Sequence, residues 1–290
     1  MLLYTGCTTP VRIPEYEAST KAVLEALGLL LMDIENANCC GAQFIESFNV
    51  MAHTAMSARI LALAEKRGLD ILAICGACSG SLKMTKHHLD TNEEARTEVN
   101  ALLAEDSLKY TGKACVKHLL QVFREDIGFR EVERNIVNPF SGIEIASHYG
   151  CHVTRPHDIM QVDNPEYPTI LDRLVEIAGA TPIDYSGKAR CCGGPLLAMD
   201  QEASEMIGRE KIENMKIAGA KGVITACAFC TIQLTQVQFG AGIDRDEIIP
   251  VLTLPQFLGS ALNIDSDRLG LHLSRISPDR ILASQKGGRL

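Results

Sequence analysis

The chain has no tryptophan, few other aromatic residues and no surplus of basic charge. Aromatics make up 5% of its 290 residues, the formal net charge is −8, and the isoelectric point is near 5.5. Proteins that hold nucleic acid need a basic face and, for single strands, aromatic platforms on which bases stack. The composition therefore argues against nucleic acid as a partner.

Long apolar runs are also missing. No stretch approaches the roughly eighteen uninterrupted apolar residues of a membrane-spanning helix, so we expect no membrane insertion. The chain enters a strand pattern at once, without the basic region and apolar run of a signal peptide, which predicts a cytoplasmic protein. With 46% apolar and 22% charged residues, the composition is that of a globular protein with a large core.

Cysteine is what the chain has in quantity, and its spacing repeats. Ten of the eleven cysteines form two sets, in which an adjacent pair is followed after 34 residues by C-x2-C. The last four cysteines of the sets are offset by a constant 152 residues, and the leading cysteine by 144, so the length difference falls in one loop. The first set is Cys7, Cys39, Cys40, Cys75 and Cys78, and the second is Cys151, Cys191, Cys192, Cys227 and Cys230.

This duplication predicts two domains of the same α/β class. In each half, short apolar strand patterns alternate with helical patterns, which is typical of a parallel sheet with crossover helices. Pro139, Ser141 and Gly142 break the pattern, so we place the boundary there and expect domains at 1–140 and 141–290. We therefore predict two duplicated domains, each a small parallel sheet with crossover helices.

The strands are expected to deliver the thiols to one edge of each sheet. LLYTGC, DILAIC, IEIASHYGC and GVITAC end on Cys7, Cys75, Cys151 and Cys227. Functional groups in such sheets gather outside the carboxyl ends of the strands. The adjacent pairs reach the same edge on loops that continue with Gly41, or with Gly193 and Gly194, where the backbone can approach a ligand closely or simply form a tight turn.

Five thiols a set point to an iron–sulfur cluster more than to zinc. Where thiols are kept reduced, repeated cysteines indicate metal or redox chemistry rather than structural disulfides. A structural zinc site needs four ligands, commonly from two C-x2-C pairs, and each set here has one such pair plus three further thiols. Adjacent cysteines ligate different irons of one cluster more easily than one tetrahedral ion. A zinc-thiolate scaffold stays as an alternative.

The duplicated Cys-Cys-Gly and C-x2-C pattern, with YTGC, HYGCH, KIENMKIAGA, CAFC and LHLSRIS, resembles the B subunit of heterodisulfide reductase over nearly the full chain. The resemblance implies that the five cysteines of each CCG domain hold a noncubane 4Fe-4S cluster, and that the two clusters reduce the coenzyme M–coenzyme B disulfide. It also implies a ferredoxin-like C subunit and a flavin-bearing A subunit of the same complex, which donate electrons. CCG domains also occur in lactate, glycolate, glycerol-3-phosphate and succinate oxidoreductases, so another substrate is the rival hypothesis.

Further residues near the second set are candidates for substrate chemistry. His148, His152 and His157 surround Cys151 in the sequence, and His152 is our preferred proton donor, although a hydrogen-bonded loop histidine is the alternative. Arg155 and Arg190 are expected to bind the anionic tails of the substrate, with an ordinary salt bridge as the alternative for Arg190. The longer loop after Cys151 is a candidate for substrate contact or gating. Cys115 is expected to be a small buried side chain.

Overall fold

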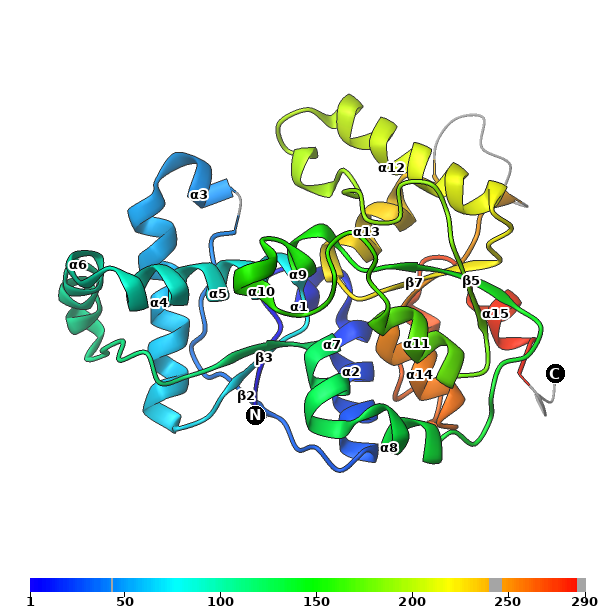
Figure 1. Ribbon diagram of the computed structural model, residues 1–290, viewed down its shortest axis with the longest axis horizontal. Helices are drawn as coiled ribbons and strands as arrows, with labels where there is room; N and C mark the ends of the chain where they lie inside the picture. Colours follow the sequence, from blue (N-terminus) through cyan, green and yellow to red (C-terminus); the bar gives the residue numbers. More distant parts are fainter. Residues whose placement is uncertain (43, 240–246, 286–290) are drawn as a thin grey trace.

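Two four-stranded sheets, both parallel throughout, form the frame of the protein (Figure 1). The computed structural model describes residues 1–42, 44–239 and 247–285. The first sheet has the order β2-β1-β3-β4 and the second the order β6-β5-β7-β8, so the two halves share one topology. This confirms the α/β class and the duplication. The strands are β1 (Leu2–Tyr4), β2 (Met32–Asp33), β3 (Ile71–Ala73), β4 (Val116–His118), β5 (Glu144–His148), β6 (Thr181–Ile183), β7 (Gly222–Thr225) and β8 (Val251–Thr253).

Helices connect the strands and cover both faces of the sheets, so the central strands are buried apolar runs. In the first half these are α1 (Thr9–Arg12), α2 (Pro14–Ala26), α3 (Phe44–Phe48), α4 (Val50–Arg67), α5 (Gly76–Thr91), α6 (Glu93–Leu103), η1 (Ala104–Asp106), α7 (Leu119–Gln121), the π-helix η2 (Val122–Ile127) and α8 (Phe129–Arg134). The second half has α9 (Cys151–Thr154), α10 (His157–Met160), α11 (Ile170–Ile177), η3 (Gly194–Leu196), α12 (Gln201–Ile217), α13 (Ala228–Gln236), α14 (Leu254–Ala261), η5 (Leu271–Leu273) and α15 (Asp279–Leu282). None of the described helices combines the length and apolar character that a membrane span requires.

Side-chain caps fix where the main helices begin. The Asn49 side chain accepts the Ala52 N–H at the start of α4, and Asp200 accepts the Ala203 N–H at the start of α12. Helix α4 ends at Gly68, whose φ of +64° suits glycine. These caps set the entry of each long helix that follows a Cys-Cys-Gly turn.

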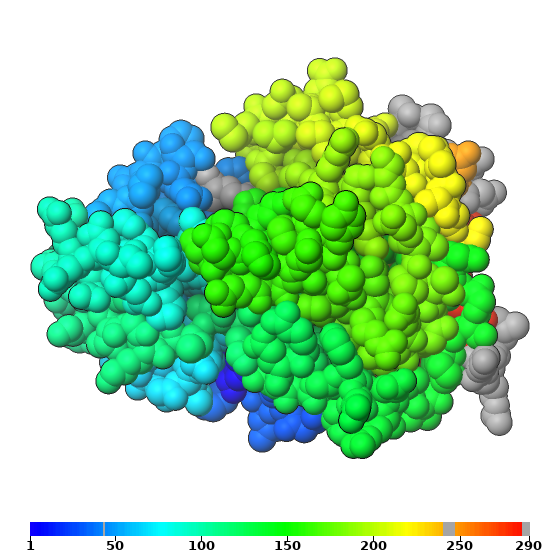
Figure 2. Space-filling model, viewed as in Figure 1, coloured from blue at the N-terminus to red at the C-terminus, as the bar shows by residue number. Residues whose placement is uncertain are grey.

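Each half packs one of its helices against a helix of the other half. Helix α2 of the first half lies against α14 of the second, and α11 of the second lies against α8 of the first. Phe140 and Phe257 stack with their ring centroids 4.3 Å apart. On the face seen in Figure 2, the green surface that follows Cys151 lies directly against the cyan surface of the first half, and α5 contacts both α9 and α10. The reciprocal pattern is that of a pseudo-twofold pair.

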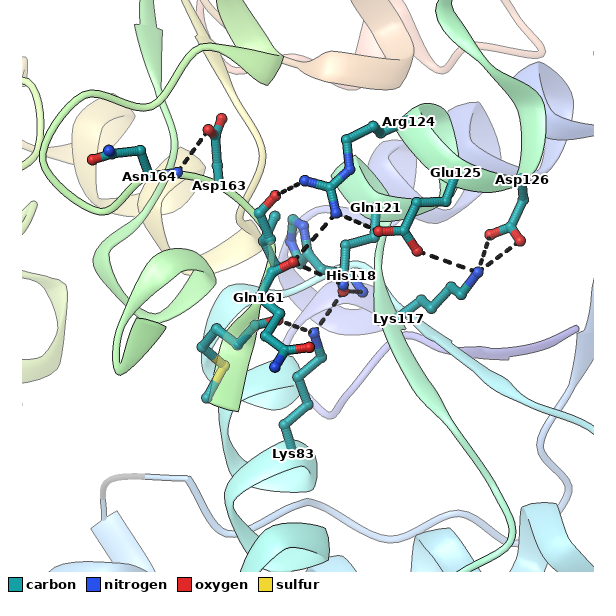
Figure 3. Close-up of polar contacts among 12 residues, drawn as sticks. Lys83, Lys117, His118, Gln121, Arg124, Glu125, Asp126, Gln161, Asp163 and Asn164 are labelled. Carbon is teal, nitrogen blue, oxygen red and sulfur yellow. Dashed lines mark hydrogen bonds and ion pairs between the residues drawn. The ribbon is translucent and has the colours of Figure 1, made fainter. Parts of the chain in front are cut away.

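The loop after Cys151 is tied to the first half by polar contacts (Figure 3). The Lys83 ammonium donates to the Met160 carbonyl at 2.6 Å and to the Gln121 side chain at 2.5 Å. Arg124, on the π-helix, donates to the carbonyls of Val162 and Gln161. The insertion that lengthens the second set is therefore part of the contact between the halves.

Cys115 is exposed, so the expectation of a buried side chain is wrong. It lies just before β4, which is an edge strand, and its backbone N–H binds the carboxylate of Asp70 at 2.9 Å. The strand pairing at this point uses the backbone of Cys115, since its carbonyl accepts the Ile71 N–H, and leaves the thiol outside.

Candidate metal centre

Each C-x2-C motif sits at the amino end of a helix that follows a central strand. Cys75 is the N-cap of α5 and Cys227 is the N-cap of α13. The first helical bonds run from Ser79 N–H to the Cys75 carbonyl and from Thr231 N–H to the Cys227 carbonyl, at 2.8 and 3.0 Å. A helix amino terminus stabilises a thiolate, so these positions favour metal ligation.

In each Cys-Cys-Gly turn, the backbone N–H of the glycine that follows the pair donates to the sulfur of the first cysteine. Gly41 N–H donates to the Cys39 sulfur and Gly193 N–H to the Cys191 sulfur, each at 3.3 Å. Both glycines have positive φ, +76° and +85°. A Cβ at Gly193 would lie 2.5 Å from the Ser204 carbonyl oxygen, so this turn requires glycine.

The glycines before the leading cysteines keep space open beside the thiols. Gly6 has φ +71°, and a Cβ there would lie 2.7 Å from the Cys78 sulfur. At Gly150, with φ +84°, a Cβ would lie 3.1 Å from the Cβ of Cys227 and 3.4 Å from the Cys230 sulfur. Two different loops thus form the same kind of cradle around their thiols.

The fold brings the members of each set together. In the first set the sulfurs of Cys7 and Cys39 are 3.4 Å apart, and those of Cys40 and Cys78 are 3.6 Å apart. In the second, the sulfurs of Cys192 and Cys230 lie within 4.8 Å of each other. The members divide by burial. The inner thiols are Cys40, Cys75, Cys78, Cys192, Cys227 and Cys230, and the outer thiols, which are exposed or partly exposed, are Cys7, Cys39, Cys151 and Cys191.

The two sets adjoin at one pair of equivalent residues. The sulfurs of Cys75 and Cys227 lie 3.8 Å apart, and Gly76 N–H also donates to Cys227. The hydroxyl of Tyr16 is buried without a hydrogen-bond partner among the described residues. Burial raises the pKa of Tyr16, and the charges of Cys227 and Cys75 raise it further. The inner ends of the sets therefore meet near the pseudo-twofold axis.

Crowded thiols cannot all lose their protons without a cation. Hydrogen bonds from Cys39 and Cys78 lower the pKa of Cys40 to about 3, and those from Cys151 and Cys192 lower the pKa of Cys191 to about 2. The pKa values of neighbouring thiols shift upward, because an ionised sulfur opposes the ionisation of a second sulfur beside it. The pKa of Cys192 rises to about 12 through its hydrogen bond to Cys191. Five soft donors with this behaviour, in a glycine-lined cradle, fit a multinuclear iron centre.

Of the other predicted residues, His152 contacts the leading cysteine of the second set. Its Nδ1 is 3.3 Å from the Cys151 sulfur, and its side chain is partly buried. His157 is exposed. Arg155 donates to the carbonyls of Ala189 and Pro165, both at 2.7 Å, and pairs with Glu166 at 2.8 Å. Its guanidinium is thus already engaged by the surrounding loops.

The Arg190 side chain is more exposed and more weakly paired than that of Arg155. Its side chain is 78% exposed and its ion pair with Glu210 is long, 3.9 Å. Both arginines line a cavity of about 880 Å³ beside β6 and α11, together with Lys188 and Tyr185. None of the ten set cysteines lines this cavity. The structure therefore brings the two arginines to one cavity, which none of the set cysteines lines.

Two further residues lie near the second set: His148, one of the three histidines that the sequence places around the leading cysteine, and Lys211, which is not singled out by the sequence. His148 is 1% exposed, and one of its ring nitrogens and the sulfurs of Cys192 and Cys230 lie within 4.8 Å of one another. Burial lowers the pKa of His148 to about 3. Lys211 is buried on α12, donates to the Gly187 carbonyl at 2.6 Å, and has its pKa lowered by burial to about 8. Its only sequence signal is that it opens KIENMKIAGA.

Comparison with known proteins agrees with this geometry. The cysteine-rich domain named CCG matches residues 1–83 and 145–235. The chain is 33% identical to the B subunit of the ferredoxin/F(420)H(2)-dependent CoB-CoM heterodisulfide reductase of Methanosarcina acetivorans, over 97% of this chain and 95% of that protein. It is 32% identical to a protein of Archaeoglobus profundus that is described as similar to the heterodisulfide reductase B subunit, over 92% of each.

Two further proteins are similar to this chain. The 8-methylmenaquinol:fumarate reductase membrane anchor subunit of Wolinella succinogenes is 29% identical over 96% of this chain and 97% of its own length. The crystal structure of a hypothetical protein from Helicobacter pylori superposes with a TM-score of 0.75 at 17% identity, covering 94% of this chain and 51% of that one, and it supports the fold alone. From the duplicated CCG domain and the relatives above 30% identity, the chain belongs to the family of heterodisulfide reductase B subunits, which are iron–sulfur oxidoreductase proteins.

Proposed function

We propose that this chain is the iron–sulfur subunit on which a heterodisulfide reductase complex splits the coenzyme M–coenzyme B disulfide. Each set of five thiols is proposed to hold one noncubane 4Fe-4S cluster. The observation that carries the proposal is the burial order of the sets: in each, inner thiols are buried and two outer thiols reach the surface. Such a centre is anchored in the protein and open to a small substrate on one side.

The reaction is balanced by a supply of two electrons and two protons, which turn one disulfide into two thiols. The iron–sulfur centres, when bound, supply the electrons that a ferredoxin-like C subunit and a flavin-bearing A subunit deliver. The two sets adjoin at Cys75 and Cys227, whose sulfurs are 3.8 Å apart, and this proximity supports the proposal that both sets act on one disulfide. The protein is proposed to work in the cytoplasm.

The chain's own side chains are proposed to handle protons and substrate charge. His152 lies beside Cys151 at the open side of the second set, where its imidazole could protonate a departing thiolate. Arg190 precedes Cys191 and is largely exposed, so it is the better candidate for an anionic tail. Arg155 is proposed to act mainly by holding the loop walls in place, because its donors are already used.

The test begins with protein isolated without oxygen together with its electron-donating partners. Iron and acid-labile sulfide are expected at about eight of each per chain, and the reduced complex is expected to convert the heterodisulfide to two thiols. The electron paramagnetic resonance (EPR) signal of the oxidised protein is expected to change when one of the product thiols is added. Stoichiometric zinc without iron would contradict the proposal, as would turnover of a hydroxy acid with no response to the disulfide.

A second function is favoured by one relative. The similarity to the membrane anchor protein of a menaquinol:fumarate reductase extends over nearly both chains, so the same fold serves other reductase complexes. On this alternative, the chain passes electrons between partner proteins and binds no disulfide. It would contain iron and sulfide and undergo reduction by a partner, but neither disulfide nor thiol would alter its EPR signal.

A further inference from the structure

The two sets of thiols have different neighbours at one equivalent position. The residue three before the leading cysteine ends a central strand in each half, and it is Tyr4 in the first and His148 in the second. The Tyr4 hydroxyl donates to the Asn38 carbonyl at 2.9 Å and is therefore satisfied by the protein. His148 has no such contact among the described residues.

Neither ring nitrogen of His148 has a hydrogen-bond partner in the part of the chain that the structure describes. The ring is 1% exposed, so bulk solvent does not reach it. A buried polar group without a partner costs free energy, and such groups in native proteins call for an explanation. An imidazole carries at least one N–H donor in either protonation state, so this donor is available at any pH.

The available donor lies beside the second set. A ring nitrogen of His148 and the sulfurs of Cys192 and Cys230 are within 4.8 Å of one another, and all three residues are buried. Cys192 and Cys230 are inner thiols of the set, in the part of the cradle that Gly150 and Gly194 keep open; a Cβ at Gly194 would lie 3.4 Å from the Cys192 sulfur. The imidazole therefore faces the space where a bound centre would be.

We propose that His148 donates its ring N–H to a sulfur of the iron–sulfur centre held by the second set, and thereby makes that centre easier to reduce than the first. This inference rests on the proposed iron–sulfur occupancy of the set. Hydrogen bonds to cluster sulfurs stabilise the more negative, reduced state and so raise the reduction potential. The first set has no equivalent donor at this described position, because the Tyr4 hydroxyl is turned to Asn38.

Lys211 adds to the same asymmetry. Its buried ammonium is close enough to Cys230, Cys192, Cys191 and Cys151 for their charges to act on it. At the equivalent position of α4 stands Arg59, whose guanidinium instead binds Asp106 at 2.5 Å and the Asn36 carbonyl at 2.8 Å. Lys211 pairs with no carboxylate in the described part of the chain, and a positive charge of this kind also favours the reduced centre of the second set.

The experiment compares reduction potentials of the two centres by EPR-monitored redox titration of the complete chain at fixed pH. The two signals are first assigned with Cys40→Ala and Cys192→Ala, each of which is expected to remove one centre. His148→Phe keeps a planar ring without a donor, and we expect it to make reduction of the second centre about tenfold less favourable, or about 59 mV for one electron. His148→Gln, which retains an N–H donor, is expected to restore much of the difference.

The matched control is Tyr4→Phe, which removes the equivalent polar atom from the first half and is expected to leave both potentials unchanged. Iron and sulfide are measured in every variant. If His148→Phe lost the iron of the second set, His148 would be a ligand rather than a donor and the inference would be overturned. Unchanged potentials at full iron content would also overturn it. Wild-type protein without iron and sulfide would instead overturn the proposed function, and this inference with it.

Discussion

Gly193 shows how one residue decides whether a thiol can reach its place. Its φ is +85°, and an added Cβ would lie 2.5 Å from a backbone oxygen at Ser204. Gly193→Ala is therefore expected to destabilise the protein by about 3 kcal/mol and to remove the iron signal of the second set. Gly219→Ala is the control, since Gly219 has φ +96° but open space around it, and it should cost only about 1 kcal/mol. Thermal unfolding and iron content measure both, and equal effects would refute the packing argument.

Arg190 allows a separate test of substrate binding. Because its guanidinium is largely exposed and weakly paired, Arg190→Ala should leave the fold intact and weaken a contact to an anionic substrate tail. We expect KM for the disulfide to rise about tenfold with little change in kcat. Arg209→Ala, which removes an exposed arginine paired with Glu205 on α12, should change neither constant. A fall in kcat at unchanged KM would show that Arg190 acts on the reacting sulfurs instead.

At the scale of elements, the junction between β4 and α7 depends on a neutral histidine. His118 caps α7 by accepting the Leu120 N–H on Nδ1 at 3.2 Å, and its Nε2–H donates to the Ala226 carbonyl at 3.0 Å. Both nitrogens are satisfied only in the neutral ring, and burial lowers the pKa of His118 to about 4. The equivalent residue at the start of α14 is Thr253, which caps its helix without titrating.

The sign of the pH effect follows from that lowered pKa. Below about pH 6.5 the unfolded chain takes up a proton on His118 that the folded chain refuses, so stability falls as pH falls toward 4. Between pH 7 and pH 5 this residue should cost about 2 kcal/mol of unfolding free energy. The His118→Thr variant should have a lower unfolding free energy than the wild type at pH 7. Between pH 7 and pH 5 its unfolding free energy should fall by about 2 kcal/mol less than that of the wild type, as measured by denaturant unfolding at both pH values. An unchanged pH slope would mean that His118 is not neutral in the fold.

The elements were predictable where the signal was local. Runs such as DILAIC and GVITAC predicted the central strands, and C-x2-C at the start of a helix predicted the edge at which the thiols gather. The orientation of His148 was not predictable in the same way, because it depends on packing between β5 and segments far along the chain. The exposure of Cys115 was missed for a similar reason. The residues of β4 alone do not determine whether this strand lies in the middle or at the edge of its sheet.

At the scale of the whole molecule, the sequence predicted two complete sets but not their contact. Cys75 and Cys227 are 152 residues apart, and packing between the halves brings their sulfurs to 3.8 Å. Each set of five cysteines lies within one half, whereas the packing is shared between the halves. The boundary proposed between residues 140 and 141 therefore separates the two sets of cysteines without dividing the core into independent parts.

This shared packing predicts how the halves behave when separated. On α2, Tyr16, Val23 and Leu24 are fully buried, and Val23 lies within 3.1 Å of the Cβ position of Gly259 on α14. Separation would expose that apolar face to water, at roughly 25 cal/mol for each Å². We expect a fragment of residues 1–140 made alone to aggregate or to unfold without cooperativity, despite holding all five cysteines of the first set.

The matched experiment supplies the missing half. Co-production of 1–140 with 141–290 should give a soluble 1:1 complex with the circular dichroism and iron content of the intact chain. Cleavage at a protease site engineered between the halves should leave them associated through gel filtration, because the α2–α14 and α11–α8 contacts do not need the linker. A monomeric 1–140 fragment that unfolded cooperatively and carried its own iron would show that each half is an independent domain. The helix contacts between the halves would then add little to its stability.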